Sequence, residues 1–215
     1  MGYFTIKNEV SSEFEEKKSI FIGHAKRVYS EEEAKNFINK IRNEHKEATH
    51  NVYAYVIGEN MGIQRYSDDG EPQGTAGIPV LDVIKKNSVT DTVIVVTRYF
   101  GGILLGAGGL VRAYSKGAAL AIKKSGIVEK VKGCSLNIEI DYDMLGKVQY
   151  NLNQNLWHIE NINYSDKVNI KIYCEIKDLN KIKNSIIEIT SGRVNLTEEN
   201  EGFYFKSGNR LYEEY

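Results

Sequence analysis

The sequence predicts an α+β protein with two domains, residues 1–130 and residues 131–206. Three observations support this prediction. The chain has 215 residues, which is longer than the usual single domain of about 100–150 residues. Segments with alternating polar and apolar residues are interleaved with segments of helical periodicity. The pattern resets near residues 126–133, and the order that follows, β-α-β-β-α-β, is typical of a ferredoxin-like domain.

The first half of the chain should begin with two antiparallel strands, Tyr3–Lys7 and Ser19–Ala25, connected near Ser11–Phe14. Ser30 precedes three glutamates, and this N-cap signature predicts a helix that ends near Lys46. The run Thr-Val-Ile-Val-Val-Thr at 92–97 fits a strand buried on both faces. Further strands are expected at 51–57 and 63–67, and further helices after residue 79 and at 110–124.

The second half of the chain alternates in the same way. Strands are expected at 136–140, 158–164, 168–176, 193–196 and 202–206, and helices at 143–156 and 179–189. Residues 207–215 have no core-forming pattern, so this tail is expected to fray.

Composition excludes several classes of protein. Hydrophobic residues make up 41% and charged residues 27%, which excludes a wholly disordered chain, and the net charge of −1 excludes a strongly basic nucleic-acid coat. The two cysteines, Cys134 and Cys174, have no CxxC spacing, which indicates a reducing compartment. The longest uncharged apolar stretch, between Arg98 and Arg112, is too short to span a bilayer, and no signal-peptide core is present. We therefore expect a cytoplasmic protein without membrane contact.

A glycine-rich loop follows the buried strand and opens a helix. Gly106, Gly108 and Gly109 leave backbone N–H groups uncovered at the helix start, where a phosphate or carboxylate is favoured. Arg98 and Arg112 bracket the loop and would add contacts to such an anion. The alternative is that the glycines only permit tight turns and close packing. The loop matches neither the P-loop pattern nor the Rossmann fingerprint.

The second unusual loop, residues 65–79, carries three carboxylates within four residues. Asp68, Asp69 and Glu71 would suit Mg²⁺ or a general base, but Asp-Asp-Gly is also ordinary turn chemistry. His50 precedes a strand and is either a hydrogen-bonded strand-end residue or a catalytic group. Thr75 has no adjacent base that would make it a nucleophile. We therefore expect no catalytic residue, no bound metal and no cofactor.

The two loops together resemble the hallmark blocks of the YigZ/IMPACT family. The blocks are Arg65–Gly77 (RYSDDGEPQGTAG) and Val95–Tyr114 (VVTRYFGGILLGAGGLVRAY). His50-Asn51 resembles the family's strand start, but Val52 stands where many members have cysteine, which excludes a cysteine nucleophile there. The resemblance implies that the N-terminal domain is a left-handed βαβ domain like domain IV of elongation factor G. It also implies a ferredoxin-like C-terminal domain.

The resemblance also implies a role in translation. Eukaryotic IMPACT relatives bind an activator of an amino-acid-starvation kinase, and the domain pairing resembles the tail of elongation factor G. We therefore expect a non-catalytic translation regulator that binds RNA or a ribosomal surface. Arg65, Arg98 and Arg112 would meet phosphates, Tyr99 would stack on a base or pack at the rim, and Gly108 and Gly109 would offer backbone donors.

Two other functions stay open. One is an enzyme that acts on a small phosphorylated or carboxylated metabolite, with Asp69 and Glu71 holding Mg²⁺ or acting as base. The other is a protein-interaction module with a partner in translation control. A deep pocket that joins both loops would favour the enzyme, an open basic groove would favour RNA, and a flat apolar patch would favour a protein partner.

Overall fold

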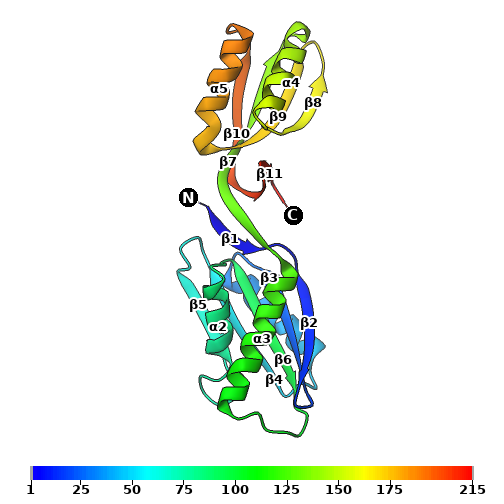
Figure 1. Cartoon of the computed structure of the whole chain (residues 1–215), viewed down its shortest axis with the longest axis vertical. Coiled ribbons are helices and arrows are strands. Elements are labelled where there is room, and N and C mark those ends of the chain that lie inside the picture. Colours follow the sequence, from blue (N-terminus) through cyan, green and yellow to red (C-terminus); the bar gives the residue numbers. More distant parts are fainter. Residues whose placement is uncertain (1, 215) are drawn as a thin grey trace. The chain divides into compact units, whose positions relative to one another are not determined.

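The computed structural model describes residues 2–214 and divides into two compact units. One unit is Tyr3–Val128, and the other is the chain from Glu129 onward together with Gly2. Both units mix helices and strands, so the predicted α+β class is confirmed (Figure 1). No helix among the described residues 2–214 is long and apolar enough to cross a membrane.

The Tyr3–Val128 unit is built on an antiparallel sheet with the strand order β2-β3-β6-β4-β5. Its strands are β2 (Val10–Glu16), β3 (Ser19–Arg27), β4 (His50–Ile57), β5 (Ile63–Ser67) and β6 (Thr92–Tyr99), and β1 (Tyr3–Ile6) precedes them. The β-branched run of β6 is buried along Thr92–Arg98, as its composition predicts, because β6 lies at the centre of the sheet.

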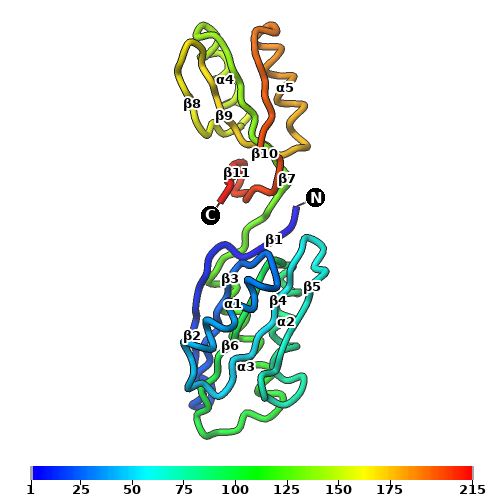
Figure 2. Tube along the Cα trace, turned by 180° about the vertical axis from the view of Figure 1, so that it is seen from behind, coloured from blue at the N-terminus to red at the C-terminus, as the bar shows by residue number. Residues whose placement is uncertain are grey.

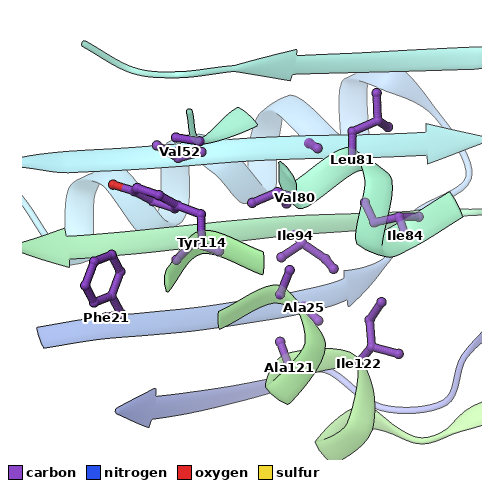
Figure 3. Close-up of a cluster of buried hydrophobic side chains, with 14 of the residues drawn as sticks. Phe21, Ala25, Val52, Val80, Leu81, Ile84, Ile94, Tyr114, Ala121 and Ile122 are labelled. Carbon is purple, nitrogen blue, oxygen red and sulfur yellow. The ribbon is translucent and has the colours of Figure 1, made fainter. Parts of the chain in front are cut away.

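Helices cover both faces of this sheet. α2 (Gly77–Lys86) and α3 (Ala107–Ser125) lie on the face seen in Figure 1, and α1 (Glu31–Glu44) lies on the opposite face, seen in Figure 2. Ser30 caps α1 as the sequence predicts, since its side chain accepts a hydrogen bond from the Glu33 N–H at 3.1 Å. α2 and α3 bury residues such as Val80 and Ile122 against β3, β4 and β6 (Figure 3).

A pair of glycines lets α3 approach the sheet closely. A Cβ on Gly23 of β3 would lie 2.4 Å from the Gly117 carbonyl oxygen of α3, far inside van der Waals contact. A Cβ on Gly117 would lie 3.0 Å from a Val96 methyl carbon. The small-residue stripe of α3 therefore lets the middle of the helix pack directly against β3.

The second unit has ferredoxin-like topology. Its elements run β7 (Ile127–Ile140), a 3-10 turn (Tyr142–Met144), α4 (Leu145–Gln154), β8 (Ile159–Tyr164), β9 (Val168–Glu175), α5 (Ile176–Thr190), β10 (Asn195–Ser207) and β11 (Arg210–Tyr212). The sheet order β10-β7-β9-β8 places the first and third strands of the β-α-β-β-α-β unit side by side. Cys134 and Cys174 are free, buried and opposite each other on β7 and β9.

Three sequence expectations about local structure are wrong. Ser11–Phe14 is not a connection but lies within β2, an edge strand that pairs with β3 through the turn at Lys17-Lys18. The strands expected at 193–196 and 202–206 are one strand, β10, with an irregularity between Glu199 and Gly202. The tail is part of the fold as far as Tyr212, because β11 pairs with β10 and Leu211 is buried.

Candidate functional site

The strand register brings two of the predicted site residues together at one end of the sheet. His50 at the start of β4 lies directly opposite Arg98 near the end of β6, and Phe21 of β3 lies opposite Arg98 on its other side. Residues that face each other in an antiparallel pair project from the same side of the sheet. Val96, two residues before Arg98, packs in the core beneath α2 and α3, so His50 and Arg98 share that face.

Glu71 enters from the 65–79 loop and joins this group. Its Oε1 accepts hydrogen bonds from Arg98 Nη1 at 2.6 Å and from the Tyr114 hydroxyl of α3 at 2.7 Å. The side chains of Arg98 and Glu71 are only 6% and 4% exposed. Burial and the hydrogen bond to Glu71 raise the pKa of Tyr114 far above its ordinary value. The loop, the sheet and α3 are therefore tied together by one buried ionic cluster.

His50 completes the cluster in a defined tautomer. Its Nδ1 lies 2.8 Å from the backbone carbonyl oxygen of Asp69, which only accepts hydrogen bonds, so Nδ1 carries the proton. In the neutral ring Nε2 is then an acceptor, and this atom lies 3.8 Å from Glu71 Oε1. The side chain is 18% exposed, so His50 forms a partly open wall beside the buried pair.

The other polar side chains of the 65–79 loop form hydrogen bonds and an ion pair that stabilise the conformation of the loop. Asp68 accepts from the backbone N–H groups of Gly74, Ala76 and Gly77 at 2.8–3.1 Å and so caps the start of α2. Asp69, at φ +48°, binds Arg42 at 2.6 Å and the Asn51 N–H at 2.7 Å. The Thr75 hydroxyl donates to the Pro72 carbonyl at 2.6 Å. The three carboxylates thus each bind different donors, which is turn chemistry rather than a shared ligand set.

A pocket of about 370 Å³ opens above the ionic cluster. Both hallmark blocks contribute to it, and most of its wall is apolar. The lining residues are Thr49, His50, Glu71, Pro72, Arg98, Phe100, Leu104, Leu105, Gly106, Ala107 and Leu110. The sequence did not single out Thr49, Phe100, Leu104 or Leu105, because apolar loop residues have no pattern that separates a pocket wall from ordinary packing.

The glycines of the second block form the start of α3. Gly106 is the N-cap at φ +70°, where a glycine avoids the strain of a side chain, and the helix has no side-chain cap. α3 begins at Ala107, three residues earlier than predicted, so Gly108 and Gly109 lie inside its first turn. Gly106 and Gly108 are exposed, so the helix N-terminus is open to solvent.

Arg112 lies away from the ionic cluster, beside a second hollow of about 240 Å³. That hollow is lined by Glu16, Lys17, Leu105, Gly109, Arg112, Ala113 and Lys116. Lys17 was not predicted as a site residue, since the turn that carries it was not recognised. Two adjacent lysines between alternating segments were the available signal.

Two further predicted residues face the other side of the sheet. Tyr99 follows Arg98 in β6, so it projects toward α1, where its hydroxyl lies 2.9 Å from His45 Nδ1. Arg65 of β5 lies 3.8 Å from Glu31 of α1. Neither residue lines either hollow. The twelve predicted site residues are thus divided between the pocket, the loop scaffold, the start of α3 and the α1 face.

Comparison with known proteins extends over both units. The Impact N-terminal domain profile matches residues 17–122, and the profile of a domain of unknown function, DUF1949, matches residues 138–193. The IMPACT family member YvyE of Bacillus subtilis is 44% identical over 99% of this chain and 98% of its own length. The IMPACT family member YigZ of Escherichia coli is 33% identical over 84% of this chain and 89% of its own.

One further relative matches less than half of this chain, and one solved structure matches nearly all of it. Protein IMPACT of Xenopus laevis is 38% identical, over 42% of this chain and 30% of its own length. A crystal structure described as a hypothetical protein aligns with a TM-score of 0.60 and 30% identity, over 94% of this chain and 98% of that one.

Proposed function

This chain belongs to the IMPACT family, and from that premise we propose that it acts in translation by binding RNA. The binding surface is the basic surface formed by four exposed cations, Lys17 and Lys18 in the β2–β3 turn and Arg112 and Lys116 on α3. Ribosomal RNA in the cytoplasm is the expected target. The observation that carries the proposal is that Lys17, Arg112 and Lys116 line one hollow and that none of the four cations forms an ion pair within residues 2–214.

The basic surface has few acidic neighbours. Within residues 2–214, none of the four cations forms an ion pair with a carboxylate; Lys116 instead lies 4.3 Å from the centre of the Phe14 ring. Glu16 is the one acidic residue among those that line the hollow between the turn and α3. Arg112 and Lys116 are four residues apart on one helix, where like charges are mildly destabilising. A polyanion would relieve this repulsion.

The backbone at the turn is also unusual. Lys17 and Lys18 have φ values of +46° and +63°, a left-handed conformation that asparagine or glycine usually occupies in a two-residue hairpin. Both side chains are exposed, and neither is held by an ion pair within the described residues. A strained turn that carries two cations on the surface is consistent with a role in binding.

The neighbouring start of α3 adds backbone donors. Gly109 lines the same hollow as Arg112, and the first turn of α3 has no side-chain cap. The positive end of the helix favours a phosphate oxygen at this point. The space beside Gly108 would allow a phosphate to approach the backbone closely. Even a Cβ built at this position would contact only the end of the Arg112 side chain, at 3.8 Å.

The proposed surface differs from the one expected from sequence. Arg98 is buried against Glu71 and is therefore not part of the proposed basic surface. Arg65 and Tyr99 lie on the α1 face and are not part of the basic surface either. Of the three predicted arginines, Arg112 alone remains in the proposal.

The test is RNA binding by the full chain at two salt concentrations. If all four cations contact a single strand, affinity should fall about 50-fold between 50 and 200 mM KCl. The double variant Arg112→Ala/Lys116→Ala removes two contacts, so the same change in salt should reduce its affinity only about sevenfold. Fluorescence anisotropy of a labelled ribosomal RNA fragment measures both values.

The matched control is Lys177→Ala/Lys181→Ala on α5, which removes two exposed cations with the same four-residue spacing. Its salt dependence should equal that of the unmodified chain. Absence of RNA binding at 50 mM KCl, or an equal effect of both double variants, would reject the basic surface as the binding site.

A further inference from the structure

The pocket above the ionic cluster is distinct from the basic surface and shares only Leu105 with the hollow beside Arg112. Its volume of about 370 Å³ is in the range of small-molecule sites. Pro72, Phe100 and Leu110 belong to its apolar wall, and Leu104 at its rim is 82% exposed. Such exposed apolar surface beside a hollow is covered when a ligand with an apolar body binds.

The floor of the pocket has hydrogen-bonding capacity that the protein does not use. Arg98 is 5% exposed, yet its Nε–H is buried without a partner among the described residues. A buried donor of this kind is normally satisfied, so the Arg98 Nε–H has the capacity to donate to an acceptor that enters the floor of the pocket. The guanidinium donates hydrogen bonds to Glu71 through Nη1 and to Ser19, 3.4 Å from Nη2, and it lies over the rings of Phe21 and Phe100, 5.5 and 5.2 Å from their centres.

The charges around the pocket favour a single negative charge on the ligand. Glu71 and Arg98 neutralise each other at 2.6 Å, and Glu71 is the sole carboxylate among the lining residues. Gly106 and Ala107 place the uncapped, positive end of α3 in the wall. A dianionic phosphate would be repelled more strongly by Glu71 than a carboxylate would be.

We propose that this pocket binds a small organic carboxylate with an apolar body. The carboxylate accepts from the free donors of Arg98 and from the first N–H groups of α3. The apolar body lies along Pro72, Leu104 and Leu110. This inference does not rest on RNA binding: it shares the start of α3 and Leu105 with the proposed RNA surface, but Arg98 and the apolar wall are not part of that surface.

The test uses four probes with one eight-carbon chain: octanoate, octan-1-ol, octylammonium and octyl phosphate. Each is titrated into the full chain and followed by the backbone amide NMR signals of Gly106, Ala107 and Leu110. We expect octanoate to bind with a Kd of about 1 mM or below, at least about tenfold tighter than octylammonium or octan-1-ol. Octyl phosphate should bind more weakly than octanoate.

A pair of adjacent variants separates the pocket from general surface binding. Leu104→Asp places a negative charge at the rim without disturbing the core and should weaken octanoate binding at least about tenfold. Ile103→Asp adds the same charge at a residue that does not line the pocket and should change the Kd by less than about threefold.

Three results would overturn the inference. One is the absence of saturable shifts with octanoate. Another is equal or tighter binding of octylammonium, octan-1-ol or octyl phosphate. The third is an equal loss of octanoate binding in the Leu104 and Ile103 variants, since binding would then not depend on the pocket.

Discussion

The Arg98–Glu71 pair offers the most direct test of how the site is held together. Both side chains are almost fully buried, and their nitrogen and oxygen atoms are 2.6 Å apart. Arg98→Met fills the volume of the stem but leaves the Glu71 carboxylate buried without its counter-charge. Loss of one partner of a buried ion pair usually destabilises a protein by about 3–5 kcal/mol. With a urea m-value of about 1.5 kcal/mol/M, the midpoint should fall by about 2–3 M.

The second variant completes a double-mutant cycle. Glu71→Gln alone leaves a buried guanidinium and should destabilise the unit by about 2–4 kcal/mol, because the amide still accepts from Arg98. The double variant removes both charges, so its loss should be about 2–3 kcal/mol smaller than the sum of the single losses. This coupling energy is the quantity that the structure predicts.

Urea unfolding of the full chain, followed by circular dichroism, measures the cycle. The protein has one tryptophan, Trp157, and it lies in the other unit, so its fluorescence is an internal control that should not shift. Additivity of the two single losses within about 0.5 kcal/mol would refute the reasoning, because it would mean that Arg98 and Glu71 do not stabilise each other.

Three further predictions concern stability. Burial beside His45 and Lys40 lowers the pKa of His24 to about 4, so between pH 6.5 and 4 the unfolded chain binds a proton that the folded chain does not. The free energy of unfolding should therefore fall by about 2 kcal/mol as pH drops through this window. His24→Asn should make the urea midpoint less dependent on pH. A variant whose urea midpoint depends on pH as strongly as that of the unmodified chain would contradict this prediction. Gly23→Ala should destabilise the first unit by about 2–3 kcal/mol in thermal unfolding, because the new Cβ would lie 2.4 Å from the Gly117 carbonyl oxygen. Gly146→Ala should instead stabilise the second unit by about 0.5–1 kcal/mol, because a Cβ there has no neighbour within 4 Å. Equal effects of the two glycine variants would be inconsistent with the packing. Asp68→Ala should lower the urea midpoint by an amount equivalent to about 2 kcal/mol, since three N–H groups lose their acceptor, and a change below about 0.5 kcal/mol would show that the loop does not need the cap.

Local signals in the sequence were sufficient to predict most of the helices and strands. The Ser30 cap with Glu33 predicted α1, and the β-branched run at 92–97 predicted the buried strand β6, because both signals depend on neighbours within a few residues. The β-α-β-β-α-β order likewise predicted the ferredoxin-like unit. Local reasoning failed at Ser11–Phe14, where an edge strand forms because β3 offers it a pairing partner.

The candidate site shows the same limit. The sequence by itself identified the two loops that build the pocket, since their glycines, carboxylates and arginines are unusual in type and density. The sequence also implied that Arg98 and Tyr99 lie on opposite faces of β6, because successive side chains of a strand point to opposite sides. Only the tertiary structure decided that His50 lies opposite Arg98, that Glu71 neutralises this arginine, and that Lys17 lies beside Arg112. These contacts join residues far apart in the chain, and strand register and helix packing, which are non-local, determine which of them form.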